Sequence, residues 1–260
     1  MSRSFSWKGW SNAIFGGVIT GLAYYSEFYG LFAWVSFIPL LHIVSKFKPN
    51  SKPFFIGYTF GLFYNLVAFY WIALNSGTSY FLAICSLIAA VLYLSIFWGL
   101  LITLVCQIKS YTLKLMIFPF VVVSMEWLRS LGPLGFPWSN LALTQINFLP
   151  IVQIMDVTGS YGVSALILII NTILYNFMIK VNKNSAFLLC ISILSIFYFW
   201  GLGIKKIDYY NKYLETFEVA VIQPNIDPNS KWDSKNKRMI KVRLDSLYEV
   251  ALSLKPDLIL

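Results

Sequence analysis

The side chains that could carry covalent chemistry are few in this sequence. The three cysteines, Cys85, Cys106 and Cys190, all lie within apolar runs. They lack the paired spacing of a metal site or of a disulfide framework, and apolar surroundings disfavour the thiolate that acts as a nucleophile. We therefore expect these thiols to pack or to face lipid, and we predict neither a metal site nor a cofactor.

Acidic and basic side chains inside apolar sequence are the next candidates. Glu126 and Arg129 are three residues apart, so on a helix they share a face and can pair. Ionisable residues near a membrane span usually face protein or water. Two interpretations stay open: a contact with a lipid headgroup, or a structural pair near the outer end of a span. His42 lacks a partner motif and receives no role, and Glu27 is expected to be solvated.

A long broken connection is the first place to look for a site. Residues 131–160 are apolar, yet Gly132-Pro133, Gly135, Pro137 and Pro150 interrupt them. Irregular backbone exposed to lipid would leave its polar groups without partners. We expect this segment to lie at the membrane interface or to line a cavity.

The elements that must position these residues follow from composition. The chain has 260 residues, of which 58% are hydrophobic and 12% charged, whereas a soluble domain carries about 25% charge. Apolar runs recur from residue 12 to 204, each about long enough to cross roughly 30 Å of hydrocarbon. The chain has a net charge of +9, but up to residue 204 its basic residues lie at the ends of these runs and not on one continuous face, so nucleic acid is not an expected partner.

The runs predict a polytopic α-helical membrane domain over residues 1–207. About seven spans are expected, at residues 12–26, 28–46, 54–74, 80–108, 112–128, 160–180 and 185–204. The first is short, and a tilted or partly interfacial position is expected for it. Aromatic residues near predicted span ends, Trp71, Tyr80 and Trp200 among them, are interpreted as interfacial anchors.

The distribution of lysine and arginine predicts the orientation. With a cytoplasmic N-terminus, the inside segments hold nine basic residues: Arg3, Lys8, Lys46, Lys48, Lys52, Lys109, Lys114, Lys180 and Lys183. The outside loops hold only Arg129. Because cytoplasmic loops carry the excess of positive charge, residues after about 205 are predicted to be extracytoplasmic.

The tail changes character beyond Asp208. Residues 217–222 form a β-type run, and residues 234–254 place Ile240, Leu244, Leu247, Ala251 and Leu254 on one helical face. A second β-type run follows at 258–260, which completes one βαβ unit. A parallel strand of this kind needs cover on both faces, so residues 208–260 are expected to be the truncated start of an α/β domain.

Two ordered blocks of the sequence resemble motifs of one protein family. The first comprises Glu126-Trp127-Leu128-Arg129, Gly135-Phe136-Pro137-Trp138, Gln145 and Asp156-Val157-Thr158-Gly159-Ser160-Tyr161-Gly162-Val163-Ser164, and the second comprises Val219-Ala220-Val221-Ile222-Gln223-Pro224-Asn225-Ile226 and Lys231-Trp232-Asp233. On these residues the chain resembles the bacterial apolipoprotein N-acyltransferases. Their multi-span membrane part carries a nitrilase-like domain on the periplasmic side of the inner membrane.

The resemblance implies acyl transfer in two steps. A cysteine thiolate takes an acyl chain from a phospholipid, and the thioester then acylates the α-amine of a lipoprotein's N-terminal diacylglyceryl-cysteine. The family's glutamate base, oxyanion-stabilising lysine and cysteine match positions beyond Leu260, so this chain alone is expected to be inactive. The implied partners are the phospholipid donor, the diacylated lipoprotein, membrane lipids and a separately encoded C-terminal portion.

Five residues match family positions that suggest substrate positioning. They are Trp138, Gln145, Gln223, Asn225 and Trp232. Trp138 and Gln145 lie in the broken connection, and Trp232 matches a tryptophan near the mouth of the active site. An interfacial anchor for Trp138 and ordinary turn chemistry for the loop residues are equally open interpretations.

A non-catalytic protein is the main alternative. In that interpretation the chain is a decayed remnant or a platform of the same family that kept the spans and lost the chemistry. A transporter is a third class, and it would show broken helices or paired charges in corresponding halves. The sequence shows no internal repeat of that kind.

Overall fold

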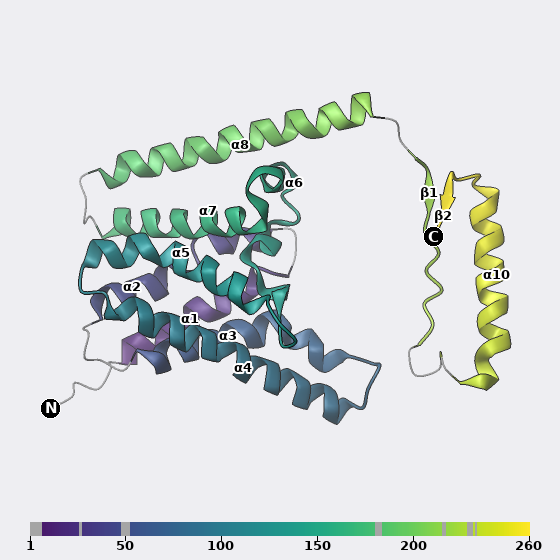
Figure 1. Ribbon diagram of the computed structural model, residues 1–260, viewed down its shortest axis with the longest axis horizontal. Helices are drawn as coiled ribbons and strands as arrows, with labels where there is room; N and C mark the ends of the chain where they lie inside the picture. Colours follow the sequence, from purple (N-terminus) through teal and green to yellow (C-terminus); the bar gives the residue numbers. More distant parts are fainter. Residues whose placement is uncertain are drawn as a thin grey trace. The chain divides into compact units, whose positions relative to one another are not determined.

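The computed structural model in Figure 1 describes residues 7–25, 28–47, 53–179, 184–214, 217–227, 231 and 233–260. The chain divides into two compact units. The first is Met1–Tyr70 with Leu87–Ile207, and the second is Trp71–Ser86 with Asp208–Leu260.

Helices dominate the described part of the chain up to residue 214. In order they are α1 (Trp7–Leu22), η1 (Tyr29–Trp34), α2 (Ile38–Lys46), α3 (Phe54–Phe69), η2 (Tyr70–Leu74), α4 (Tyr80–Gln107), α5 (Tyr111–Arg129), η3 (Pro137–Ser139), η4 (Leu141–Gln145), α6 (Leu149–Val152), α7 (Met155–Met178) and α8 (Ser185–Tyr213). The short 3₁₀ segments η3 and η4, together with α6, fill the broken connection between α5 and α7.

Six helical segments among the described residues are long and apolar enough to cross a membrane. They are Tyr29–Lys46, Phe54–Leu74, Tyr80–Gln107, Tyr111–Arg129, Met155–Met178 and Ala186–Tyr213. They correspond to six of the predicted spans. The remaining predicted span corresponds to α1, whose 16 residues extend roughly 24 Å at the rise of an α-helix.

Three predicted spans differ from the structure at their boundaries. Helix α1 runs from Trp7 to Leu22 instead of from 12 to 26. Helix α8 continues to Tyr213, well past the predicted end at residue 204, because the polar residues after 204 extend the helix without interrupting it. Helix α7 begins at Met155, before the predicted start at 160, but Gly159 breaks it with a non-helical φ of 66°. This left-handed conformation is one that glycine adopts without steric cost.

Close backbone contact joins α1 to α3. Gly17 and Gly21 are four residues apart and lie on one face of α1. A Cβ atom at Gly17 would lie 2.5 Å from the carbonyl oxygen of Phe60, and one at Gly21 would lie 2.8 Å from that of Tyr64. The two glycines therefore allow the helices to approach closely, as small residues do at helix interfaces in membranes.

An aromatic cluster forms the centre of the helical unit. The rings of Phe60 on α3 and Trp98 on α4 are 4.8 Å apart, and Phe37 before α2 lies 5.9 Å from Trp98. Phe118 on α5 contacts Phe37 at 6.1 Å. All four side chains are buried. The cluster therefore packs α3, α4 and α5 against the start of α2.

Polar side chains satisfy the backbone where η1 passes into α2. Asn171 on α7 accepts a hydrogen bond from the amide of Phe37 at 3.0 Å and donates one to the carbonyl of Ala33 at 2.8 Å. At the other end of α2, Lys114 on α5 donates to the carbonyl of Phe47 at 2.8 Å. Each break in the helix thus receives a partner from a distant helix.

The tail contains the predicted strand, helix and strand. Strand β1 (Val219–Ala220) pairs in parallel with β2 (Leu258–Ile259), with Val219 opposite Leu258. Between them lie η5 (Ser234–Asn236) and α10 (Lys237–Ser253). On the predicted apolar face Ala251 is buried, whereas Leu254 is 68% exposed, so that face is only partly covered by the described residues.

The glycine contact gives a test of helix packing. We expect Gly17→Ala to lower the stability of the helical unit by about 1 to 3 kcal/mol, because the new methyl group forces α1 away from α3. The measurement is thermal unfolding of the purified protein in detergent. Gly201→Ala is the matched control, since no neighbour lies within 4 Å of a Cβ there. An equal loss in both variants would contradict the packing role of Gly17.

Candidate functional site

The broken connection between α5 and α7 is held by charged side chains of α5. Glu126 accepts a hydrogen bond through Oε1 from the amide of Leu141 at 2.8 Å, and Arg129 donates through Nη2 to the carbonyl of Ser139 at 3.2 Å. The two side chains are only 4% and 3% exposed. We call Glu126 and Arg129 the α5 clamp, because together they hold backbone groups two residues apart.

The clamp refines the expectation for Glu126 and Arg129. The two side chains share a face of α5 as predicted, but their printed hydrogen bonds go to backbone groups of the connection and not to each other. Burial of both side chains also argues against contact with a headgroup at the protein surface. The sequence identified the right residues but not their partners, which are backbone groups further along the chain.

The carbonyl of Ser139 is a point of convergence for three helical elements. Besides Arg129, it accepts hydrogen bonds from the hydroxyl groups of Tyr24 and Tyr64, each at 3.1 Å. These hydroxyl groups lie 2.7 Å from each other. Tyr24 follows α1 and Tyr64 lies on α3, so the connection is attached to α1, α3 and α5 at one atom.

Helix α7 holds the connection from its other side. Asn140 accepts through Oδ1 from the amide of Ala142 at 2.9 Å and from the hydroxyl of Ser164 at 2.8 Å. Its Nδ2 donates to Ser160 at 3.3 Å. Asn140 therefore caps η4 and fastens it to the segment of α7 that follows the break at Gly159.

Gln145 ends η4 and is buried, with 1% of its surface exposed. Its Nε2 donates to the carbonyl of Gly30 at 2.9 Å and to the hydroxyl of Thr144 at 2.8 Å, while its Oε1 accepts from the indole nitrogen of Trp34 at 3.1 Å. The amide is fully engaged by protein groups. Gln145 thus fixes η4 against η1 and orients the ring of Trp34.

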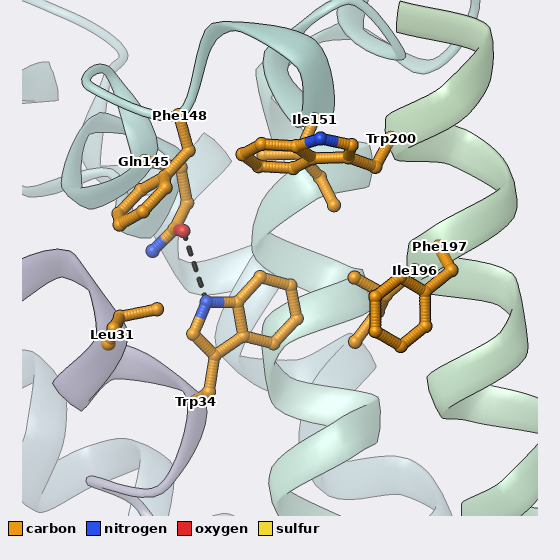
Figure 2. A pocket seen from close by; sticks show the side chains of 8 residues that line it. All are labelled: Leu31, Trp34, Gln145, Phe148, Ile151, Ile196, Phe197 and Trp200. Atoms are coloured by element: carbon orange, nitrogen blue, oxygen red, sulfur yellow. Dashed lines mark hydrogen bonds between the residues drawn. The ribbon is translucent and has the colours of Figure 1, made fainter.

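An apolar pocket of about 460 Å³ lies beside Gln145. Side chains of η1, η4, α6 and α8, with Phe148 just before α6, surround it: Leu31, Trp34, Gln145, Phe148, Ile151, Ile196, Phe197 and Trp200. Figure 2 shows the rings of Trp34 and Trp200 on opposite sides of a central space, with Ile196 and Phe197 along its α8 wall. The volume is typical of sites for small organic ligands.

Trp138 occupies a different position from Gln145, although both lie in the connection. Its side chain is 55% exposed and its ring meets Phe136 edge-on at 5.1 Å. Phe136 in turn contacts Phe69 at 4.9 Å. Trp138 is thus a partly exposed tryptophan whose ring packs against Phe136. It does not line the pocket beside Gln145.

The remaining predicted residues lie in the tail. Gln223 and Asn225 are exposed on the loop after β1, and Asn225 has a positive φ of 48°. Asparagine tolerates this conformation better than most residues, which agrees with turn chemistry. The two belong to the second unit, so the structure does not join them to Trp138 and Gln145 in one site. Trp232 lies outside the described residues.

Sequence reasoning missed several residues that build the site. Trp200 was predicted to be an interfacial anchor, which stays a prediction. Its place in the pocket, 6.4 Å from the ring of Phe148, was not predicted. Tyr24, Tyr64 and Trp34 were not identified. Apart from the contact between the two tyrosines, their partners lie between 75 and 115 residues away in sequence.

The thiols remain separate from the pocket and the clamp. Cys106 is buried within α4, and Cys85 and Cys190 are exposed on α4 and α8. All three lie in segments long and apolar enough to span a membrane. Within the ranges that the structure describes, no three His, Cys, Asp or Glu side chains gather into a metal-binding group.

Comparison with known proteins gives consistent matches. Residues 16–173 match the apolipoprotein N-acyltransferase N-terminal domain. The apolipoprotein N-acyltransferase of Geobacter metallireducens is 32% identical over 235 residues, 85% of this chain and 44% of the relative. Those of Borreliella burgdorferi and Rickettsia typhi are 27% and 28% identical, over 83% and 90% of this chain. The chain spans less than half the length of these curated relatives.

The clamp gives a test that separates hydrogen bonding from charge. Glu126→Gln keeps an oxygen that can accept from the amide of Leu141, whereas Glu126→Leu leaves that buried amide without a partner. We expect the leucine variant to be less stable than the glutamine variant by about 1.5 to 3 kcal/mol. Thermal unfolding in detergent measures the difference. Equal stability of the two variants would show that the hydrogen bond to Leu141 does not hold the connection.

Proposed function

Because this chain belongs to the apolipoprotein N-acyltransferase family, we propose that it forms the membrane part of an enzyme that N-acylates lipoproteins. The acyl donor is a phospholipid, and the acceptor is the α-amine of the N-terminal diacylglyceryl-cysteine. The match over residues 16–173 carries this proposal. It runs from α1 into α7 and includes the whole connection held by the α5 clamp.

The catalytic groups are proposed to lie in the part of the family that this chain does not cover. Acyl transfer through a thioester needs an activated thiolate with a base and oxyanion donors nearby. The three thiols here lie in apolar helices that lack such a group of side chains among the described residues. A C-terminal portion carrying the glutamate, lysine and cysteine of the family is therefore proposed as a partner.

The described residues supply the platform for that chemistry. In this proposal the connection between α5 and α7 presents Trp138 to the lipid or lipoprotein substrate. Gln145 holds the ring of Trp34 in place through the hydrogen bond to its indole nitrogen. Gln223 and Asn225 contribute to substrate positioning from the tail. The fixed backbone of the connection supports this role, because a substrate-positioning group must be held rigidly by the residues around it.

A chimeric enzyme tests the proposed function. Residues 1–173 of this chain would replace the matching part of the Geobacter metallireducens enzyme in cells depleted of their own N-acyltransferase. We expect mass spectrometry to detect conversion of diacylated to triacylated lipoprotein. The 260-residue chain alone should give no conversion. A stable, membrane-inserted chimera without product would contradict the proposal, and product from the chain alone would contradict the placement of the catalytic groups.

Trp138 is tested in the same chimera. Trp138→Ala should reduce turnover more than it reduces membrane insertion or thermal stability, because the ring is proposed to contact substrate. Trp127→Ala is the matched control, since Trp127 is 54% exposed but lies on α5 rather than in the connection. Equal turnover in the two variants would support an interfacial anchor instead.

Orientation is proposed from the excess of basic residues in alternate loops. The N-terminus is cytoplasmic, and residues after about 205 are periplasmic in a bacterial inner membrane. Single cysteines at Asn50 and Asn182, in a background without the native cysteines, should react only with reagents that reach the cytoplasm. A cysteine at Asn229 should react from the periplasm. Reaction of Asn50 and Asn229 positions from the same side would contradict this topology.

A further inference from the structure

Helix α8 meets the rest of the helical unit at only a few points. Its membrane-length window is 6% buried, whereas those of the other five candidate spans are 39% to 44% buried. Gly203 fits against the carbonyl of Pro150, where a Cβ atom would collide. Lys206 forms an ion pair with Asp156 of α7. The apolar pocket beside Gln145 lies next to the residues of α8 that precede these contacts, from Ile196 to Trp200.

The chemistry of the pocket favours an apolar occupant. Seven of its eight lining side chains are aliphatic or aromatic, and the eighth, Gln145, has its amide oxygen and nitrogen engaged by Trp34, Gly30 and Thr144. A ligand rich in hydrogen-bonding groups would lose its water there and find few partners beyond the indole N–H of Trp200. The flat faces of Trp34, Phe148 and Trp200 instead suit an unbranched hydrocarbon chain.

We propose that this pocket binds one acyl chain of a membrane phospholipid. The chain would enter from the surrounding hydrocarbon, since Phe197 on the α8 wall is 70% exposed and the most apolar 18-residue stretch of α8 has a mean hydropathy of 2.2. Removing such a chain from the pocket would leave an apolar space beside a helix that protein contacts barely cover. The acyl chain therefore completes the packing of α8 against η1 and α6.

The ion pair gives the bound lipid a direction. Lys206 follows Phe197 by nine residues, about 13 Å along a helix. Charged side chains of membrane proteins concentrate toward the aqueous interface. The headgroup would lie toward the Lys206 and Asp156 end of α8, and the acyl chain would pass Gly203 and Trp200 to reach Ile196.

A second apolar hollow provides an internal reference for ordinary lipid contact. It has a volume of about 490 Å³, and its lining residues all come from α4 and α5. Phe97 is its only aromatic lining residue. Any lipid-facing surface will touch acyl chains, so specific binding must exceed contact at this hollow.

Photolabelling tests the assignment on the 260-residue chain itself. The purified protein would be placed in phosphatidylcholine nanodiscs that contain a phosphatidylcholine with a diazirine in the middle of one acyl chain. After illumination, mass spectrometry of peptides should show several-fold more label at residues 196–200 and 148–151 than at 97–104 on α4. Equal labelling of the two regions would overturn the proposal.

Filling the pocket from opposite walls provides the decisive comparison. Ile196→Trp and Leu31→Trp should each reduce labelling of residues 148–151 several-fold. Ile193→Trp is the matched control, because Ile193 lies on α8 outside the pocket and is 44% exposed. Thermal unfolding and labelling of α4 identify a misfolded variant. Unchanged pocket labelling in both folded filling variants would overturn the proposal.

This proposal deepens the proposed function by placing a lipid chain beside the connection, but its test does not depend on acyl transfer. A chimera without acyltransferase activity would leave the labelling pattern unchanged. Conversely, an active chimera together with a 260-residue chain whose pocket is not labelled above the α4 and α5 reference would contradict the lipid site while leaving the proposed function in place.

Discussion

In the hydrocarbon of a bilayer, a backbone amide or carbonyl must find its partner within the protein, because no water is present to replace it. A continuous helix meets this requirement by itself. The connection between α5 and α7 does not, since it contains only the short segments η3, η4 and α6. The arrangement of the surrounding helices depends on supplying hydrogen-bond partners to the backbone of this connection. Glu126 and Arg129 on α5, Tyr64 on α3 and Ser164 on α7 all direct polar atoms to this segment.

The same requirement explains why buried polar residues occur in so apolar a chain. Asn171 serves the break before α2 in the way that Asn140 serves the start of η4. Each helix is thereby fixed in rotation, because its polar residue must face one particular backbone group. Apolar contacts such as those of Phe60 and Trp98 then fill the space between helices whose orientation is already determined.

The sequence predicted most of the architecture but little of the site geometry. Apolar runs and lysine positions depend on local composition, so the six long helices and the βαβ order of the tail could be predicted. The irregular character of the connection was also readable from its glycines and prolines. The partners of Gln145 and of Ser139 were not, because contacts such as Trp34 to Gln145 cross more than a hundred residues. The place of Trp200 in the pocket was not predicted either, because the other walls of the pocket come from η1, η4 and α6, which lie far from α8 in sequence.

The sparse burial of α8 has a consequence for how its sequence can change over evolutionary time. A helix that contains an 18-residue stretch with a mean hydropathy of 2.2 and has little protein contact can partition into the bilayer before the other helices assemble around it. At most of its positions the only requirement on a substitution is then that the side chain stays hydrophobic. Leucine, isoleucine, valine and phenylalanine are therefore interchangeable along much of its length. Divergence among related chains should therefore be rapid on the lipid face of α8 and slow at Gly203, where backbone contact with Pro150 admits no side chain.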